Sequence, residues 1–157
     1  MSESEILQRL SDLGLELPPT TPPVASYVPV VEAGGLAFVA GQIPMLDGRQ
    51  VFPGTLGQNV TVAEGQQGAA QAALQSISIL RAALGTLDRV RRIAQVTVYI
   101  AAVPGFLEHP EVANGASELF VGAFGEAGTH ARAAVGMSSL PRGASVEVTV
   151  IAEVDPA

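Results

Sequence analysis

Residues 61–101 read TVAEGQQGAAQAALQSISILRAALGTLDRVRRIAQVTVYIA and contain the long helix and the central strand that decide the fold. Thr61 and Glu64 have the spacing of a capping box, and apolar residues then recur every three or four positions as far as Gly85, which predicts a helix. Small alanines on the apolar stripe of this helix favour close packing against a sheet. Residues 93–101 are β-branched and apolar, as in a buried strand.

A hairpin and a loop are predicted before this unit. Residues 28–32 and 36–40 are strand-like runs joined by Ala33-Gly34-Gly35, in which two glycines permit the positive φ angles of a hairpin turn. Residues 41–59 carry turn dipeptides and no hydrophobic periodicity, so we expect a loop there.

A third helix and two more strands are predicted after the central strand. Residues 110–124 begin with a proline suited to a first helical turn and are followed by Gly125, which predicts the helix end. Residues 132–138 and 145–154 are strand-like, and we expect them to pair as a second hairpin around Pro141-Arg142-Gly143. The order α-ββ-α-β-α-ββ predicts an α+β domain in which the helices pack on one face of a mixed sheet.

The first 26 residues are expected to form a separate N-terminal segment. Ser2 and Glu5 have capping-box spacing and open a short amphipathic helix that ends at Gly14. Four prolines between positions 18 and 23 predict an extended tether. We therefore expect residues 1–26 to be a helix with a Pro-rich tether and residues 27–157 to be the α+β domain.

Composition narrows the classes of function. The chain has 157 residues, 48% of them hydrophobic, and no cysteine, which predicts a sizeable core and excludes a disulfide scaffold or a Cys-ligated metal site. Its net charge of −7 repels phosphate backbones, so nucleic acid is a disfavoured partner. No apolar run approaches the roughly 18 residues that cross a bilayer, and the N-terminus lacks the basic flank of a signal peptide. We expect a cytoplasmic protein that does not contact membranes.

Few side chains offer catalytic chemistry. The signatures of nucleotide loops, nucleophile elbows and zinc proteases are absent, and two histidines are too few to indicate a metal site. His109 precedes a proline at a helix start and fits a capping or surface role. His130 enters a strand two residues before Arg132 and could reach the same cleft, although a packing role is the simpler interpretation. The cluster of Arg89, Arg91 and Arg92 beside an aspartate is typical of a solvated helix end.

Arg132 and Glu147 are the most informative charged residues. Arg132 opens an otherwise apolar strand, and Glu147 lies among valines on the strand predicted to be its hairpin neighbour. One interpretation is a structural salt bridge between these two side chains. The other is functional: Arg132 binds a substrate carboxylate through two hydrogen bonds, and Glu147 handles a proton or a water molecule. The residue pattern leaves both open.

Two ordered motifs resemble the signatures of the Rid family, also called YjgF. The stretch from Tyr27-Val28 to Gly41-Gln42-Ile43-Pro44 resembles the N-terminal signature, and the stretch from Ala131-Arg132 through Leu140-Pro141 to Glu147 resembles the C-terminal one. Asn114-Gly115 lies where family members carry an asparagine on the substrate side. The resemblance covers roughly residues 27–152.

The resemblance implies a chorismate-mutase-like α+β fold, a homotrimer with active sites in the clefts between subunits, and no cofactor. The implied reaction is hydrolysis of reactive 2-enamine and 2-imine carboxylates to 2-keto acids and ammonia. By the family pattern Arg132 would bind the substrate carboxylate and Glu147 would position the attacking water. Tyr27 and Asn114 would line the pocket, and Gly41 and Ala134 would contribute backbone contacts.

The sequence departs from the family pattern at three positions, which leaves two alternative functions open. Ala134 stands where many imine-hydrolysing members have cysteine, and Gly136 and His130 replace other common residues. A non-catalytic protein that binds small carboxylates is one alternative. An endoribonuclease, a label that some members carry, is the other, although the net charge disfavours it.

Overall fold

The computed structural model describes residues 1–20 and 26–156. The elements in chain order are α1 (Glu3–Asp12), β1 (Val30–Ala33), β2 (Leu36–Gln42), β3 (Met45–Leu46), β4 (Arg49–Gln50), α2 (Val62–Leu84), the 3-10 turn η1 (Leu87–Arg89), β5 (Val90–Ala101), α3 (His109–Phe124), η2 (Gly125–Gly128), β6 (Ala131–Met137), η3 (Pro141–Gly143) and β7 (Val146–Val154).

The helix ends follow the local signals of the sequence. Both predicted capping boxes form. The side chain of Ser2 caps α1 and that of Thr61 caps α2, and in each case the glutamate three residues later accepts a hydrogen bond from the backbone N–H of the capping residue. Gly85 ends α2 in the left-handed region at φ 79°, which a glycine adopts without steric cost. The predicted third helix is also confirmed, as α3, with Pro110 in its first turn.

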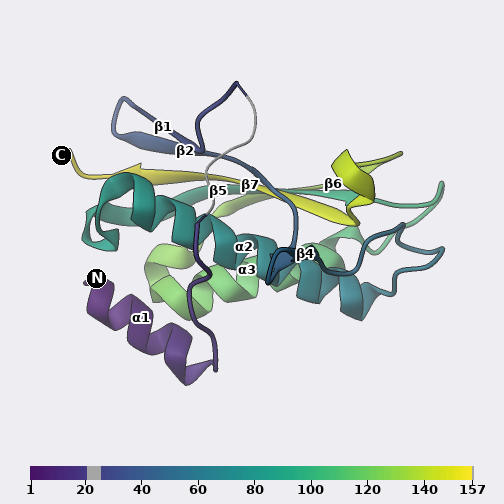
Figure 1. Ribbon diagram of the computed structural model, residues 1–157, viewed down its shortest axis with the longest axis horizontal. Coiled ribbons are helices and arrows are strands. Elements are labelled where there is room, and N and C mark those ends of the chain that lie inside the picture. The colour runs from purple at the N-terminus through teal and green to yellow at the C-terminus, as the bar shows by residue number, and fades with distance from the viewer. Residues whose placement is uncertain (21–25, 157) are drawn as a thin grey trace.

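The main sheet has the strand order β1-β2-β7-β5-β6 (Figure 1). The predicted first hairpin is confirmed, since β1 pairs antiparallel with β2 through the turn at Gly34 and Gly35. The predicted second hairpin is wrong. Strand β6 pairs parallel with β5 at the edge of the sheet, whereas β7 pairs antiparallel with β5 on its other side and with β2.

The chain geometry after β6 explains that correction. A hairpin needs a short turn that folds a strand back on its neighbour. Here η3 instead carries the chain past the end of β5 to the far side of that strand. The hydrogen bond from the Ala101 amide to the Ser145 carbonyl, at 2.9 Å, marks this point. The parallel β5–β6 pair is connected through α3, as a parallel connection requires. The result is the expected mixed α+β sheet with packed helices, although β7 lies two strands away from β6.

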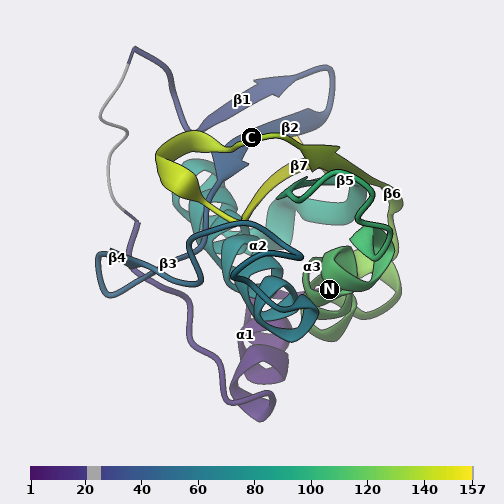
Figure 2. The same cartoon turned by 90° about the vertical axis from the view of Figure 1, so that its right-hand side faces the viewer.

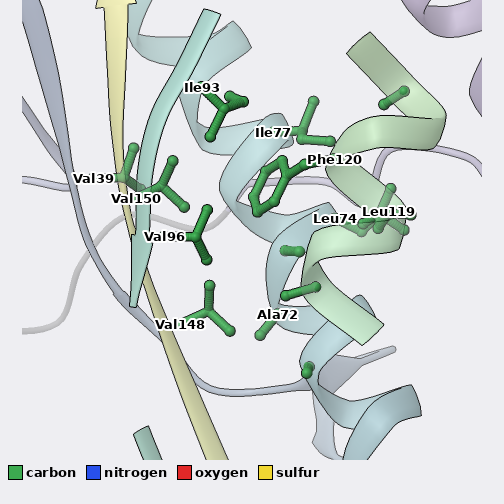
Figure 3. Packing of buried hydrophobic residues seen from close by; sticks show 14 of the residues in the cluster. Val39, Ala72, Leu74, Ile77, Ile93, Val96, Leu119, Phe120, Val148 and Val150 are labelled. Carbon is green, nitrogen blue, oxygen red and sulfur yellow. The ribbon is translucent and has the colours of Figure 1, made fainter. Parts of the chain in front are cut away.

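The helices cover one face of this sheet (Figures 1 and 2). Helix α2 packs beneath β2 and β7, α3 beneath β5 and β6, and α1 against α3. Gly115 allows α2 and α3 to approach closely, because a Cβ atom there would overlap the backbone carbonyl of Gln66. Figure 3 shows Val96, Val148 and Val150 of the sheet facing Ile77 of α2 and Phe120 of α3.

Helix α1 belongs to the same core. Ile6 and Leu10 are fully buried and join the hydrophobic cluster of the domain. The Glu3 carboxylate accepts a hydrogen bond from the Leu87 amide at 2.8 Å and forms an ion pair with Arg81 at 2.7 Å. These two interactions hold the start of α1 against the end of α2. Of the predicted Pro-rich tether, positions 18–20 are irregular and positions 21–23 lie outside the described residues.

The opposite face of the sheet is only partly polar. Val31, Phe38, Val135 and Met137 are large apolar side chains exposed by 37 to 51% on the strands. The segment predicted as a plain loop contains the short hairpin β3–β4. No helix in the described ranges 1–20 and 26–156 has the length and apolar character needed to cross a membrane.

Candidate functional site

The structure divides the six predicted site residues into two groups on different surfaces. Tyr27, Gly41 and Glu147 line one cavity, whereas Asn114 and Arg132 are hydrogen-bonded to each other beside α3. Ala134 lies two residues after Arg132 on β6 and therefore faces the same way. In the strand register Arg132 is paired with Val96, whose side chain lies on the face of the sheet that the helices cover. Glu147 is paired with Tyr99, and both side chains lie on the opposite face.

The first group lines a cavity of about 450 Å³. Its walls come from the N-terminal segment, β2, α2, η3 and β7, and they carry more apolar than polar surface: Pro18, Pro19, Thr20, Tyr27, Pro29, Gly41, Gln42, Ile43, Met45, Gln75, Ser78, Ile79, Pro141, Arg142 and Glu147. The wall formed by residues 18–20 is fixed by a hydrogen bond from the Ser78 hydroxyl to the Pro18 carbonyl. Arg142, at φ 58°, brings a cation to the same cavity.

Gly41 is required by the position of the Glu147 carboxyl group. A Cβ atom at position 41 would overlap Oε1 of Glu147 and lie 2.9 Å from its Cδ atom. The strand pairing between β2 and β7 shifts register between Val39 and Gln42, so Gly41 lies in a bulge that faces Glu147. The structure therefore supplies a reason for glycine in the Gly-Gln-Ile-Pro motif.

Glu147 is a half-buried carboxyl group with no hydrogen bond or ion pair to another side chain in the described part of the chain. Burial raises its pKa above the ordinary value, because the charged form loses solvation. A carboxylate with a raised pKa is a stronger proton acceptor once it ionises. Such a group in a cavity is a candidate general base.

The second group holds Arg132 at the exposed edge of the sheet. Its Nη1 atom donates to Oδ1 of Asn114 at 2.7 Å and to Oγ of Ser117 at 3.2 Å. These two bonds use both hydrogens of Nη1 and leave the edge formed by Nε and Nη2 without a partner among the described residues. That edge can bind a carboxylate through two parallel hydrogen bonds.

Ser117 and His130 were not predicted as site residues. Ser117 Oγ lies 3.0 Å from Nε2 of His130, and Nδ1 of His130 lies 2.6 Å from the Gly128 carbonyl oxygen. The packing role predicted for His130 is real but incomplete, since its ring also meets Phe120 edge-on. The spacing of Asn114 and Ser117 on one helix face was the signal that could have found Ser117.

The structure also explains Gly136, another of the three departures from the family pattern. A Cβ atom at Gly136 would lie 2.5 Å from Nε2 of His109, so the glycine leaves room for this ring against β6. His109 is half-buried and meets Phe106 edge-on at 5.0 Å between ring centroids. The predicted capping role is therefore wrong, because no side chain caps α3, and the ring is only partly at the surface.

The predicted Arg132–Glu147 salt bridge is wrong for a single chain. It assumed neighbouring hairpin strands, whereas β5 separates β6 from β7 and the two side chains leave opposite faces of the sheet. The arginine cluster is not a solvated helix end either. Arg91 and Arg92 are on β5, and the ion pairs Arg89–Glu32 at 2.6 Å and Arg91–Asp155 at 2.9 Å join strand ends.

The arrangement favours acid–base and carboxylate chemistry. Across residues 1–20 and 26–156, no group of three or more His, Asp or Glu side chains could hold a metal ion. Arg132 offers two directed donors for an anion, and Glu147 offers a proton acceptor in a cavity of mixed polar and apolar lining. One chain presents these functions on separate surfaces.

Comparisons with known proteins identify the family and agree with the fold. Residues 7–154 match the family model described as "YjgF/chorismate mutase-like, putative endoribonuclease". A Trypanosoma cruzi protein named TCP17 is 42% identical over 156 residues, which cover 99% of this chain and 98% of that protein. Two crystal structures, each with a TM-score of 0.91, also match.

The first of these structures is an Agrobacterium tumefaciens protein of unknown function, 42% identical, with 98% of this chain and 94% of that chain covered. The second is a Shewanella oneidensis protein named as a "putative endoribonuclease", 32% identical, with 98% and 100% covered. Two motifs, the sheet topology and the matched length thus point to one conclusion: the chain belongs to the YjgF/chorismate-mutase-like family, the Rid family.

Proposed function

We propose that the protein hydrolyses 2-imine and 2-enamine carboxylates to 2-keto acids and ammonia in the cytoplasm. The observation that carries this proposal is a pair of complementary sites: an oriented guanidinium with a free bidentate edge, and a carboxyl group of raised pKa that has no side-chain partner among the described residues and lines a cavity. A carboxylate-bearing electrophile attacked by water needs these two functions.

Arg132 binds the substrate carboxylate. The free Nε–Nη2 edge forms two charge-assisted hydrogen bonds, while Asn114 holds the other side of the guanidinium at 2.7 Å. Because the carboxylate is present in both the substrate and the transition state, this contact contributes binding and orientation more than chemistry. The apolar wall of the cavity accepts the substrate side chain.

Glu147 moves the proton. Water attacks the imine carbon, the C=N π electrons move to nitrogen, and the Glu147 carboxylate takes a proton from the attacking water. Glu147 returns this proton to the nitrogen of the resulting carbinolamine, and the C–N bond then breaks as the hydroxyl oxygen forms the carbonyl. The hydroxyl proton passes to the Glu147 carboxylate and from it to the released ammonia. Together, the iminium form of the substrate and one water molecule yield the 2-keto acid and an ammonium ion. An enamine first takes up a proton at carbon to become the same iminium.

This proposal requires two chains for one site, because Arg132 and Glu147 face opposite ways in one chain. A homotrimer in which β6 and α3 of one subunit meet the cavity of the next would unite them at three equivalent clefts. The exposed apolar residues on the open sheet face, such as Phe38 and Val135, support an assembly that covers this face.

Charge gives less support to RNA cleavage, although the family description and one matched structure carry the word endoribonuclease. The chain has a net charge of −7, and two arginines of its basic cluster are neutralised by Glu32 and Asp155. A phosphate backbone would therefore meet a field that opposes binding.

The test couples the protein to an amino-acid oxidase that releases 2-imino acids, with the residual imine trapped by semicarbazide. We expect the wild-type protein to reduce trapped imine and to accelerate ammonia release, and Glu147→Gln to lower turnover by roughly 10²–10⁴-fold. Arg132→Ala is expected to raise KM, roughly ten- to a hundredfold, since a hydrogen bond to a charged group contributes about 1.5–3 kcal/mol.

The non-catalytic alternative gives a different result in the same experiment. A carboxylate-binding protein would bind the keto acid, lose that binding in Arg132→Ala, and never exceed the rate of spontaneous hydrolysis. If wild-type protein behaves in this way with several imino acids, the enzyme proposal is refuted and the binding function replaces it.

A further inference from the structure

We propose that Ser117 and His130 are positioning residues that orient the guanidinium of Arg132 through a continuous chain of hydrogen bonds. The chain runs from the Gly128 carbonyl through His130 and Ser117 to Nη1 of Arg132, with distances of 2.6, 3.0 and 3.2 Å. The inference deepens the proposed function and rests on it in one respect, namely that Arg132 binds a carboxylate.

The first link fixes the tautomer of His130. A carbonyl oxygen only accepts hydrogen bonds, so Nδ1, 2.6 Å from the Gly128 oxygen, carries the proton. In the neutral ring Nε2 is therefore the acceptor. The T-shaped contact with Phe120, at 5.9 Å between centroids, holds the plane of the ring against the core.

The second link fixes the direction of the Ser117 hydroxyl. Ser117 has one hydrogen, and the acceptor Nε2 at 3.0 Å takes it. The oxygen lone pairs then point away from His130, and one of them meets Nη1 of Arg132 at 3.2 Å. Without the histidine acceptor, the hydroxyl would be free to rotate and could present its hydrogen to the guanidinium, which has no acceptor to offer.

The third link determines which edge of Arg132 is available. Asn114 takes one hydrogen of Nη1 and Ser117 takes the other, so the guanidinium plane is fixed at two points and its Nε–Nη2 edge stays free. A fixed plane lowers the entropy lost when a carboxylate binds to that edge. Helix α3 and the segment before β6, which pack against each other (Figure 2), thus both contribute to the orientation of Arg132.

Two other roles for this pair are possible in principle and make different predictions. A serine bonded to an oriented histidine is also the arrangement of an activated nucleophile. In this chain, however, one lone pair of Ser117 already accepts a hydrogen bond from a cation, which lowers its nucleophilic reactivity. A purely structural role would stabilise α3 against β6 and leave the guanidinium unaffected.

Four substitutions separate these roles. His130→Phe keeps the aromatic contact with Phe120 but removes both polar links, whereas His130→Gln keeps an acceptor that can reach Ser117. Ser117→Ala removes the hydroxyl, and Ser117→Thr retains it. The matched pairs should have similar urea midpoints within each position, so that differences in Arg132 are not differences in folding.

The direct readout is the guanidinium NMR spectrum of ¹⁵N-labelled full-length protein, with Arg132 assigned by comparison with Arg132→Lys. In wild type we expect separate Nη1 and Nη2 signals, because the two hydrogen bonds to Nη1 slow rotation about the Nε–Cζ bond, which exchanges the two nitrogens. His130→Phe and Ser117→Ala should merge or broaden these signals, and His130→Gln and Ser117→Thr should preserve them. This measurement does not depend on any enzymatic activity.

The functional readout is binding of 2-oxobutanoate and, where turnover is found, the separation of KM from kcat. We expect His130→Phe and Ser117→Ala to weaken binding or raise KM roughly three- to tenfold, as loss of one orienting hydrogen bond would, with kcat little changed. If the protein has no deaminase activity, the proposed function fails while the NMR result still decides the positioning role.

Three outcomes would overturn the inference. Unchanged Nη signals in both His130→Phe and Ser117→Ala would show that the pair does not orient Arg132. Equal loss in His130→Gln and His130→Phe would show that the acceptor is irrelevant. Covalent labelling of Ser117 by a fluorophosphonate, together with a collapse of kcat in Ser117→Ala, would assign a nucleophile in place of a positioning residue.

Discussion

Substitution of Gly41 by alanine should disable Glu147 without unfolding the protein. The added methyl group would lie 2.9 Å from Cδ and 3.2 Å from Cγ of Glu147, and closer still to Oε1. Carbon atoms in contact are normally about 3.5–4.0 Å apart, so the carboxyl group must move by roughly 0.5–1 Å or change rotamer. Gly41 does not have a positive φ, so alanine fits its backbone without strain.

The expected loss follows from that displacement. A misplacement of about 1 Å at a catalytic group can lower the rate roughly a hundredfold, which corresponds to about 2.7 kcal/mol of transition-state stabilisation. The change in stability should remain within about 1 kcal/mol, because the smaller entropy of the unfolded alanine chain offsets the rotamer cost at Glu147.

A double-mutant cycle measures the coupling. We compare kcat for imine hydrolysis in wild type, Gly41→Ala, Glu147→Ala and the double variant, with urea unfolding as the control for folding. The double variant should be no slower than Glu147→Ala alone, since the methyl group then has no carboxyl group to displace. The reasoning is refuted if Gly41→Ala retains the wild-type rate, or if it lowers kcat by the same factor in both backgrounds.

Three further predictions concern stability and assembly. Burial raises the pKa of Glu147, so the folded state keeps this proton to a higher pH than the unfolded chain, and stability falls as pH rises through that window. Glu147→Gln should therefore melt at a higher temperature than wild type at pH 7, and calorimetry should show that this gain disappears below about pH 4. Phe120 is fully buried between the sheet and α2, so Phe120→Ala should lower the free energy of unfolding by about 3–5 kcal/mol in urea titrations; a loss under 1 kcal/mol would contradict the packing described. Sedimentation equilibrium should give about 48 kDa, three times the chain mass of 16.1 kDa, and a mass of one chain at micromolar concentration would exclude the two-chain site.

Local signals in the sequence predicted most secondary structure. The capping boxes at Ser2 and Thr61 and the glycines at positions 34, 35 and 85 act within a few residues, so their effects are readable without knowledge of the fold. The error came with β6, because strand pairing depends on where η3 carries the chain and not on the alternation within a strand. The hairpin β3–β4 was missed because two-residue strands have no period to detect.

The site residues also differ in whether the sequence alone reveals them. Arg132 and Glu147 stand out in the sequence as charges within apolar strands, and both lie in the second of the two ordered motifs whose resemblance indicated the family before any contact was known. Ser117 and His130 carry only weak signals, namely the spacing of Ser117 from Asn114 on one helix face and the position of His130 two residues before Arg132. Their relation to Arg132 exists only after α3 packs beside β6.

The sequence by itself determined the order of the elements, the apolar faces that form the core and the residue types available for chemistry. These follow from residue properties and spacing along the chain, which are local quantities. The tertiary structure alone decided that Glu147 and Arg132 leave opposite faces of the sheet, that Gly41 makes room for a carboxyl group, and that a histidine orients a serine toward an arginine. Each of these depends on contacts between residues far apart in sequence, which exist only after the sheet order and helix packing are set.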